Sequence, residues 1–192
     1  MKRTSLLFSS VAALALAATT AFAGPLPGAI FTTTATGNRV NANLYGAKED
    51  VYLDGGPGGN APASAAALPA GDYYFQVTDP SGKVLLSQDP VANRRFTVAP
   101  SGVIVSASTH VTGVDVDHAV LGARTVQLFP YADTPNPGGV YKVWVTPVAR
   151  FVGDVSQIDN PTENHGFVNS WSKTDNYKVR NPADTCCDCS CP

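Results

Sequence analysis

The sequence predicts an all-β fold, an antiparallel β-sandwich, and three observations support this prediction. Short runs rich in β-branched and aromatic residues alternate apolar and polar side chains with a period of two, as half-buried strands do. Glycine and proline separate these runs and number 17 and 15 in a chain of 192 residues. After residue 23 no segment has the 3.6-residue apolar periodicity of a surface helix. Many short strands joined by Gly/Pro turns favour two facing sheets over a βαβ fold.

The clearest strand signal lies in residues 71–87, which we predict to form a β-hairpin. Residues 71–78 place aromatic and aliphatic side chains on one face and mostly polar ones on the other. Asp79–Gly82 (Asp-Pro-Ser-Gly) has the composition of a type I turn, because Asp accepts from the backbone ahead, Pro fixes φ and Gly closes the turn. A four-residue loop there sets Val77 opposite Val84.

The rest of the chain divides into further strands and long loops. Strands are predicted at residues 30–35, 40–45, 51–53, 95–98, 103–108, 124–131, 140–146 and 176–179. Loops are predicted at 55–70, with one helical turn over 63–68, at 109–117, which is polar, and at 153–174.

Residues 1–23 are predicted to be a signal peptide that is removed on export. Two basic residues open the chain, residues 6–18 are an apolar run too short to span a bilayer, and residues 21–23 (Ala-Phe-Ala) form a small-x-small cleavage site. The alternative is an N-terminal membrane anchor. We expect three parts: a signal helix at 1–23, one sandwich domain at 24–180 and a tail at 181–192.

The charge balance excludes two classes of partner. Removing Lys2 and Arg3 with the signal leaves 11 basic residues against 15 acidic ones, a formal charge of −4 with neutral histidines. Nucleic acids and anionic membrane surfaces select for basic patches, so we expect neither as a partner. No later segment is long and apolar enough to span a membrane. The sequence predicts a secreted protein of the periplasm, the cell surface or the extracellular space.

All four cysteines lie in the last seven residues: Cys186, Cys187, Cys189 and Cys191. The sandwich therefore has no disulfide, and we expect burial and strand pairing to stabilise it. After export we expect the tail to be flexible and to form disulfides, within itself or to another chain, that tether or cross-link the protein. The same thiolates are ligands for Cu(I) or Zn(II), and a processed or inert tail is a third reading.

A second candidate site lies in the loop between two histidines. His110, Asp115, Asp117 and His118 supply two imidazoles and two carboxylates within nine residues, a donor set suited to Zn(II) or another transition ion. The alternative is a polar turn that places these side chains on the surface. Residues of the later loop that would complete such a site are Asp159, Glu163 and His165.

The sequence predicts no enzyme. It contains no nucleophile elbow and no HExxH, and Gly55–Gly59 lacks the Lys-Ser/Thr and the helix of a phosphate-binding loop. A hydrolase would need a pocket that joins His110, Asp117 and His165. Four aromatic residues would line a carbohydrate-binding face if exposed, or a sandwich core if buried: Tyr74, Tyr141, Trp144 and Trp171.

Leu68–Lys83 resembles the hairpin of prealbumin-like and Cna-B-type β-sandwich repeats on bacterial surfaces. In combination with Val51–Gly56, Asn136–Val145 and Lys173–Val179, it is also similar to a group of uncharacterised secreted bacterial proteins. The resemblance implies an Ig-like or prealbumin-like sandwich, export and a surface role, with no known activity.

Cna-B-type domains often carry a Lys–Asn isopeptide bond between their first and last strands, formed with the help of a buried acid. The first predicted strand, residues 30–35, has no Lys. We therefore expect no such bond here, because Asn176 would need Lys48 or Lys142 beside it.

The sequence thus favours an exported, non-enzymatic structural or adhesive module of the cell surface or extracellular matrix. Its cysteine tail would fix it to an extracellular protein, to a surface polymer or to another copy of itself. The alternative is a metal-binding protein that uses the tail, the loop from His110 to His118, or both, with Zn or Cu. No other cofactor is predicted.

Overall fold

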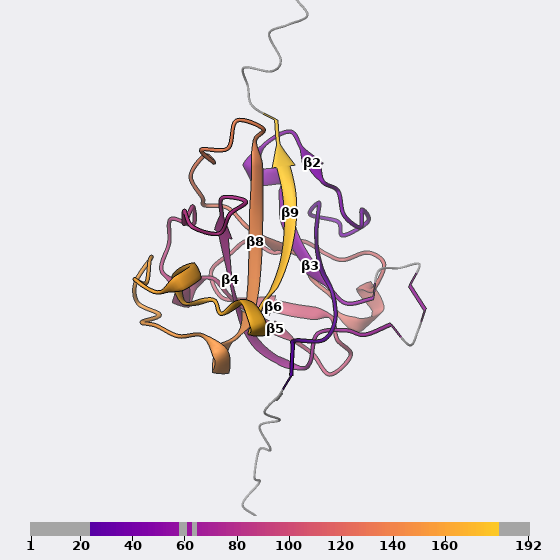
Figure 1. The fold of residues 1–192 in the computed structure, drawn as a ribbon. Helices are drawn as coiled ribbons and strands as arrows, with labels where there is room; N and C mark the ends of the chain where they lie inside the picture. The colour runs from indigo at the N-terminus through magenta and orange to yellow at the C-terminus, as the bar shows by residue number, and fades with distance from the viewer. Residues whose placement is uncertain (1–23, 58–60, 63–64, 181–192) are drawn as a thin grey trace, which may run out of the picture.

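The computed structural model describes residues 24–57, 61–62 and 65–180. These residues form two β-sheets, one of three strands and one of six (Figure 1). The predicted signal peptide at 1–23 and the cysteine tail at 181–192 lie outside the described residues. Within the described part of the chain, no helix is long and apolar enough to cross a bilayer.

The larger sheet is centred on β4 (Gly71–Thr78), the first arm of the predicted hairpin. β4 pairs antiparallel with β8 (Val140–Pro147) on one side and with β5 (Arg95–Val98) on the other. β9 (Lys173–Val179) lies beside β8 along its length, as Figure 1 shows. The strand order is β2-β9-β8-β4-β5-β6. The two outer strands are β2 (Leu44–Tyr45) and β6 (Ile104–Ala107).

The smaller sheet is antiparallel, with the order β1-β3-β7. Its strands are β1 (Ile30–Thr33), β3 (Tyr52–Gly55) and β7 (Val126–Gln127). Residues 111–115 continue this sheet beyond β7, where the amide of Gly113 donates to the carbonyl of Thr125 at 3.0 Å. Residues 111–115 are therefore held against the sheet by backbone hydrogen bonds.

Short 3₁₀ turns connect the strands of the described part. They are η1 (Lys48–Asp50), η2 (Val91–Asn93), η3 (Ala119–Leu121), η4 (Val148–Arg150), η5 (Glu163–Gly166) and η6 (Asn169–Trp171). The last three belong to residues 148–172, which we call the cover loop. The helical turn predicted over 63–68 is absent from its described part, residues 65–68.

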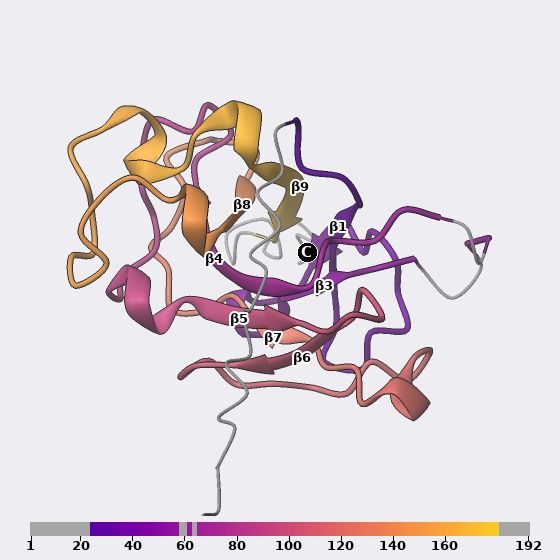
Figure 2. The same ribbon diagram turned by 90° about the horizontal axis from the view of Figure 1, so that it is seen from below.

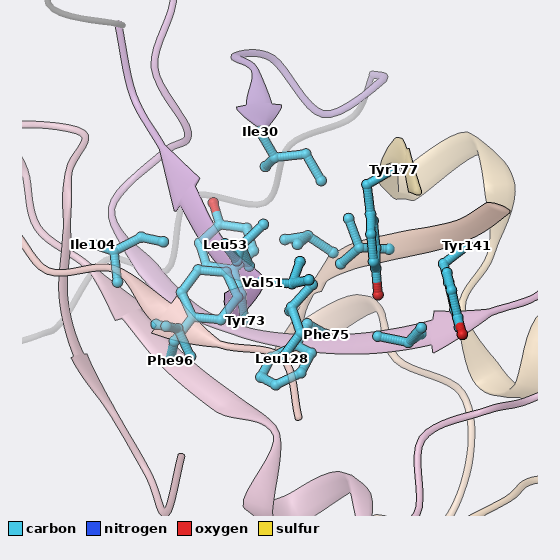
Figure 3. Close-up of a cluster of buried hydrophobic side chains, with 14 of the residues drawn as sticks. Ile30, Val51, Leu53, Tyr73, Phe75, Phe96, Ile104, Leu128, Tyr141 and Tyr177 are labelled. Carbon is cyan, nitrogen blue, oxygen red and sulfur yellow. The ribbon is translucent and has the colours of Figure 1, made fainter. Parts of the chain in front are cut away.

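The main core is shared by the two sheets (Figure 3). Ile30 and Leu53 of the smaller sheet pack in one cluster with Tyr73, Phe75 and Phe96 of the larger one. Full burial of one such side chain stabilises the folded state by about 1.5–3 kcal/mol relative to leaving it exposed. Because residues 24–180 contain no cysteine, this burial and the strand pairing hold the body together.

A second apolar cluster covers the opposite face of the larger sheet. Tyr74 of β4 and Trp144 of β8 pack there with Phe151 and Phe167 of the cover loop. The ring centroids of Tyr74 and Phe151 are 5.4 Å apart, and those of Phe151 and Phe167 are 5.6 Å apart, both edge to face. The end of β4 is therefore buried on both faces.

The described residues are mostly β, with one antiparallel and one mixed sheet and no helix longer than a short 3₁₀ turn, as the prediction of a β-rich fold requires. The prediction of antiparallel pairing throughout is wrong at one point, because β2 runs parallel to β9. The predicted strand 95–98 coincides with β5, and 140–146 is one residue shorter than β8. The predicted strands 40–45 and 124–131 shrink to two-residue strands. Their other residues form single backbone hydrogen bonds to several different segments, such as Ala42 to Thr32 and Leu128 to Val51, and do not continue one ladder.

The predicted hairpin has the expected turn but a different register. The amide of Gly82 donates to the carbonyl of Asp79 at 3.0 Å, as in a β-turn. Val77, however, pairs with Leu86, whose amide donates to the Val77 carbonyl at 2.9 Å, and Val84 is exposed. The cause is the Asp79 carboxylate, which also accepts from the amide of Val84 at 3.0 Å and so widens the loop by two residues.

Candidate functional site

Each of the three histidines of the chain contacts an aspartate through one ring nitrogen. A His–Asp pair is also the general-base half of many nucleophilic sites, so the surroundings of the second nitrogen decide what each pair can do. The pairs are His110 Nε2 with Asp89 at 3.1 Å, His118 Nδ1 with Asp115 at 2.6 Å, and His165 Nδ1 with Asp159 at 2.7 Å.

His110 uses both ring nitrogens within the fold. Its Nδ1 lies 2.8 Å from the carbonyl of Gln127, and its Nε2 faces the carboxylate of Asp89. The ring is buried and packs edge to face on Phe75, with centroids 4.8 Å apart. Both nitrogens therefore face acceptors, and neither is available to a metal ion or a substrate.

Arg94 continues this cluster and is fully buried. Its Nη2 donates to the carbonyl of Ile158 in the cover loop at 2.8 Å, and its Nε lies 3.9 Å from Asp89 Oδ1. Burial lowers the pKa of the guanidinium to about 10, and the carboxylates of Asp89 and Asp159 oppose this shift. Asp89 thus lies between two buried basic groups, His110 and Arg94. This role could not be predicted from the sequence, because an Arg before a strand is more often exposed.

His118, Asp115 and Asp117 form a separate cluster with a residue that the sequence analysis missed. Asp115 is 2% exposed and accepts from His118 Nδ1 and from the amide of Asp117 at 3.0 Å. Asp54 of β3 is equally buried and accepts from the amide of Gly55 at 2.7 Å. Burial and the carboxylates of Asp115 and Asp117 raise the pKa of Asp54 to about 8. Its place directly after the apolar run of residues 51–53 was the only signal in the sequence.

The structure does not assemble the predicted four-residue metal site. His110 contacts Asp89, whereas His118 contacts Asp115, so the two imidazoles belong to different clusters. In the part of the chain that the structure describes, no group of three or more His, Cys, Asp or Glu side chains is arranged to hold a metal ion. The prediction failed because spacing within a loop does not show which distant residue each side chain meets.

His165 does not complete a site with the loop either. Its Nδ1 contacts Asp159 within the same cover loop, and its buried Nε2 has no hydrogen-bond partner among the described residues. His165 and Asn164 both have left-handed φ angles, 57° and 52°. The carbonyl of Asn164 accepts from Gln76 Nε2 of β4 at 2.9 Å. Asn164 therefore attaches the cover loop to the sheet, whereas the side-chain hydrogen bond of His165 stays within the loop.

The four aromatic residues do not form a common exposed face. Trp144 is buried and donates from Nε1 to Thr78 Oγ1 at 2.9 Å. Tyr74 lies in the second cluster, and Tyr141 stacks on Tyr177 with centroids 5.4 Å apart. Trp171 lies under the guanidinium of Arg150, 4.7 Å from the ring centroid. Three of the four therefore serve packing.

The two lysines considered for an isopeptide bond occupy different places. Lys142 lies opposite Asn176 in the β8–β9 register, but its Nζ lies over the ring of Trp144, 5.5 Å from the centroid. Asn176 is exposed. Lys48 Nζ contacts Asp133 at 2.9 Å and the carbonyl of Tyr131 at 3.1 Å. Lys142 is thus the only one of the two in register with Asn176, and it lies on the solvent side rather than beside a buried acid.

A cavity of about 500 Å³ lies where β9 ends. Its wall includes Lys48, Glu49, Asp133, Tyr141 and Arg180. Charges of both signs line it, so it is not a site selective for anions or cations. Arg180 is the last described residue, and the cysteine tail follows it directly in sequence.

The resemblance to prealbumin-like and Cna-B-type repeats stays a prediction at this point. Comparisons of the chain with protein-family models, with curated proteins and with solved structures found no match.

Proposed function

We propose that this protein is an exported, non-enzymatic structural or adhesive module of the cell surface or extracellular matrix. In this proposal an Ig-like or prealbumin-like sandwich presents its loops. The cysteines at 186, 187, 189 and 191 tether it to a second chain or to a surface partner.

One observation carries the proposal, namely that all four cysteines follow the last strand closely in sequence. β9 pairs with β8 from Lys173 to Lys178, and the amide of Arg180 donates to the carbonyl of Tyr45 at 2.9 Å. The chain is therefore fixed to the sheet up to its last described residue. All four cysteines follow within the next 11 residues. A reactive segment attached to the rim of a rigid body suits cross-linking.

The chemistry of the body supports a non-catalytic role. Both ring nitrogens of His110 face acceptors, and His165 contacts Asp159 within the cover loop. Nε2 of His118 has no hydrogen-bond partner among the described residues, so no serine or threonine there is hydrogen-bonded to it. A general base without a nucleophile within reach does not make a hydrolase.

The test compares the chain lacking residues 1–23 with a variant in which all four cysteines are replaced by Ser, both purified without reductant. We expect the unsubstituted protein to run as dimers or higher species on a non-reducing gel and to collapse to monomer with reductant. The Ser variant should be monomeric in both lanes. Monomer in every lane, with an intact mass showing no added partner, would refute the tether.

The same native mass tests the alternative, metal binding by the tail. Bound Zn or Cu adds a defined mass that a chelator removes, and the Ser variant should lack it. Stoichiometric metal that depends on the cysteines would replace the tether with a thiolate metal site.

A further inference from the structure

Most of the large exposed aliphatic side chains in the described residues lie in two neighbouring segments of the chain. Of the ten large hydrophobic side chains that are exposed in the described residues, seven come from two short segments, 111–121 and 40–44. Val120, on η3, is 97% exposed. We call these seven residues the valine face: Val40, Leu44, Val111, Val114, Val116, Val120 and Leu121.

The two segments adjoin each other although they are far apart in sequence. The amides of Val114 and Val116 donate to the carbonyls of Ala35 and Thr36, each at 3.0 Å. A groove of about 600 Å³ is lined by residues 38–40 and 42–44 from one segment and by Asp117 from the other. Figures 1 and 2 place η3 on the side of the molecule away from the cover loop.

The loop that carries most of this face is held in a fixed conformation. Asp115 points inward and binds His118 and the amide of Asp117, so its neighbours Val114 and Val116 point outward. The backbone is packed so closely that a Cβ at Gly113 would lie 1.9 Å from the carbonyl oxygen of Ala35. The backbone that carries these valines is therefore held in one conformation by hydrogen bonds and close packing. Apolar patches presented in this way mark interaction surfaces.

The charges at the groove indicate which partner fits. The groove is lined by one cation and one anion, Arg39 and Asp117, and both are exposed. A two-fold axis through the face would set Arg39 of each copy against Asp117 of the other, so the surface is complementary to itself. An anionic membrane surface would require basic residues around the apolar patch. A lipid interface also favours aromatic side chains, whereas every large hydrophobic side chain that is exposed in the described residues is aliphatic.

We propose that the valine face is the interface of a non-covalent homodimer. Its centre is the aliphatic cluster around Val116 and Val120, and its rim contains two reciprocal Arg39–Asp117 ion pairs. The proposal does not depend on the cysteine tether, since it concerns a different surface.

The experiment measures mass in solution by sedimentation, using the chain without residues 1–23 and with all four cysteines replaced by Ser. Without thiols, any dimer is non-covalent, so the result is separate from that of the tether test. We expect a dimer that Val120→Glu weakens at least about tenfold, because a charge is then buried against the partner. Val84→Glu is the matched control, since Val84 is 43% exposed on a different loop, and should leave the dimer unchanged.

Charge reversal tests the geometry of the pairing. Arg39→Asp and Asp117→Arg should each weaken the dimer, and the two reversals together should restore it, because opposite charges face each other again. A monomer at all concentrations, or a dimer whose dissociation constant is unchanged by Val120→Glu, would overturn the proposal. A monomer that floats with phosphatidylcholine vesicles only when Val120 is intact would overturn it in favour of a lipid surface.

Discussion

The cover loop (residues 148–172) and the loop that carries η3 (residues 109–122) show opposite arrangements. The cover loop turns its aromatic residues inward, where Phe151 and Phe167 join the second cluster, and it exposes acids such as Asp159 and Glu163. The η3 loop turns an acid inward and its aliphatic residues outward. Each loop therefore has polar anchors and an apolar surface. In the cover loop both face the body, whereas in the η3 loop the apolar surface faces away from it.

This difference shows that the hydrogen bonds that attach a loop to the body determine which of its side chains face inward. In the cover loop, Arg94 reaches from the body and binds a backbone carbonyl, so the loop side chains nearest the sheet are free to be apolar. In the η3 loop, the anchor is a side chain of the loop itself, Asp115, which occupies the inner position. Period-two alternation then places the valines in solvent.

The largest expected effect comes from removing the inward apolar surface of the cover loop. Phe167→Ala should lower the free energy of unfolding by about 3–5 kcal/mol, because the ring is fully buried and leaves a cavity. Urea denaturation measures this change. Val152→Ala, at an exposed position of the same loop, is the control and should change stability by less than about 0.5 kcal/mol. Equal effects would mean that the second cluster does not stabilise the fold.

The next largest effect comes from the anchor of the cover loop. Arg94→Met keeps much of the side-chain volume but removes the donor to Ile158 and leaves Asp89 with only one of its two basic neighbours, His110. Loss of one partner of a buried charged cluster costs about 3 kcal/mol, which urea denaturation measures. Limited proteolysis should also cleave the cover loop faster. The control is the next residue, Arg95→Met, whose exposed pair with Asp72 contributes at most about 1 kcal/mol. Similar losses for both variants would refute the anchoring role.

A third prediction concerns the polar interior behind the η3 loop. The pKa of Asp54 is raised to about 8 in the fold, against about 3.9 in an unfolded chain. Between these values the native state keeps a proton that the unfolded state has lost. Stability contributed by this group therefore falls as pH rises, by up to about 1.4 kcal/mol per pH unit.

Asp54→Asn has no proton to lose, and its amide oxygen can still accept from Gly55. Its stability relative to the unsubstituted protein should rise by about 2 kcal/mol between about pH 5 and pH 8, allowing for partial relaxation of the site. Unfolding measured across this pH range tests the prediction. Two parallel pH profiles would show that Asp54 titrates normally and that the interior there is well solvated.

Much of the sheet could be predicted from sequence because local chemistry decides it. β5 and β8 follow alternation bounded by Pro and Gly turns, and both were located to within one residue. The hairpin register could not be predicted, because it depends on which backbone amides donate hydrogen bonds to the Asp79 carboxylate. The strands β2 and β7 are set by partners in the tertiary fold, not by their own pattern.

The candidate sites were harder to predict because they depend on long-range pairing. His110 meets Asp89, and Arg94 meets Ile158, across 21 and 64 residues of chain. The alternation Val114-Asp115-Val116-Asp117 was visible, but an alternating pattern does not say which set of side chains faces inward. Valine normally takes the inner position, and here a hydrogen-bonded Asp takes it instead.

The smallest expected effect on stability is at the outermost residue of the valine face. Val120→Ser should change the free energy of unfolding of the dilute monomer by less than about 0.5 kcal/mol, since the side chain is 97% exposed and has almost no contact to lose. Thermal unfolding at low concentration measures this. At high concentration the unsubstituted protein should be more stable than the variant, because only folded chains dimerise and dimerisation therefore stabilises the folded state. A concentration-independent midpoint for both proteins would mean that the outward valines stabilise nothing, and the two loops would then differ in orientation but not in role.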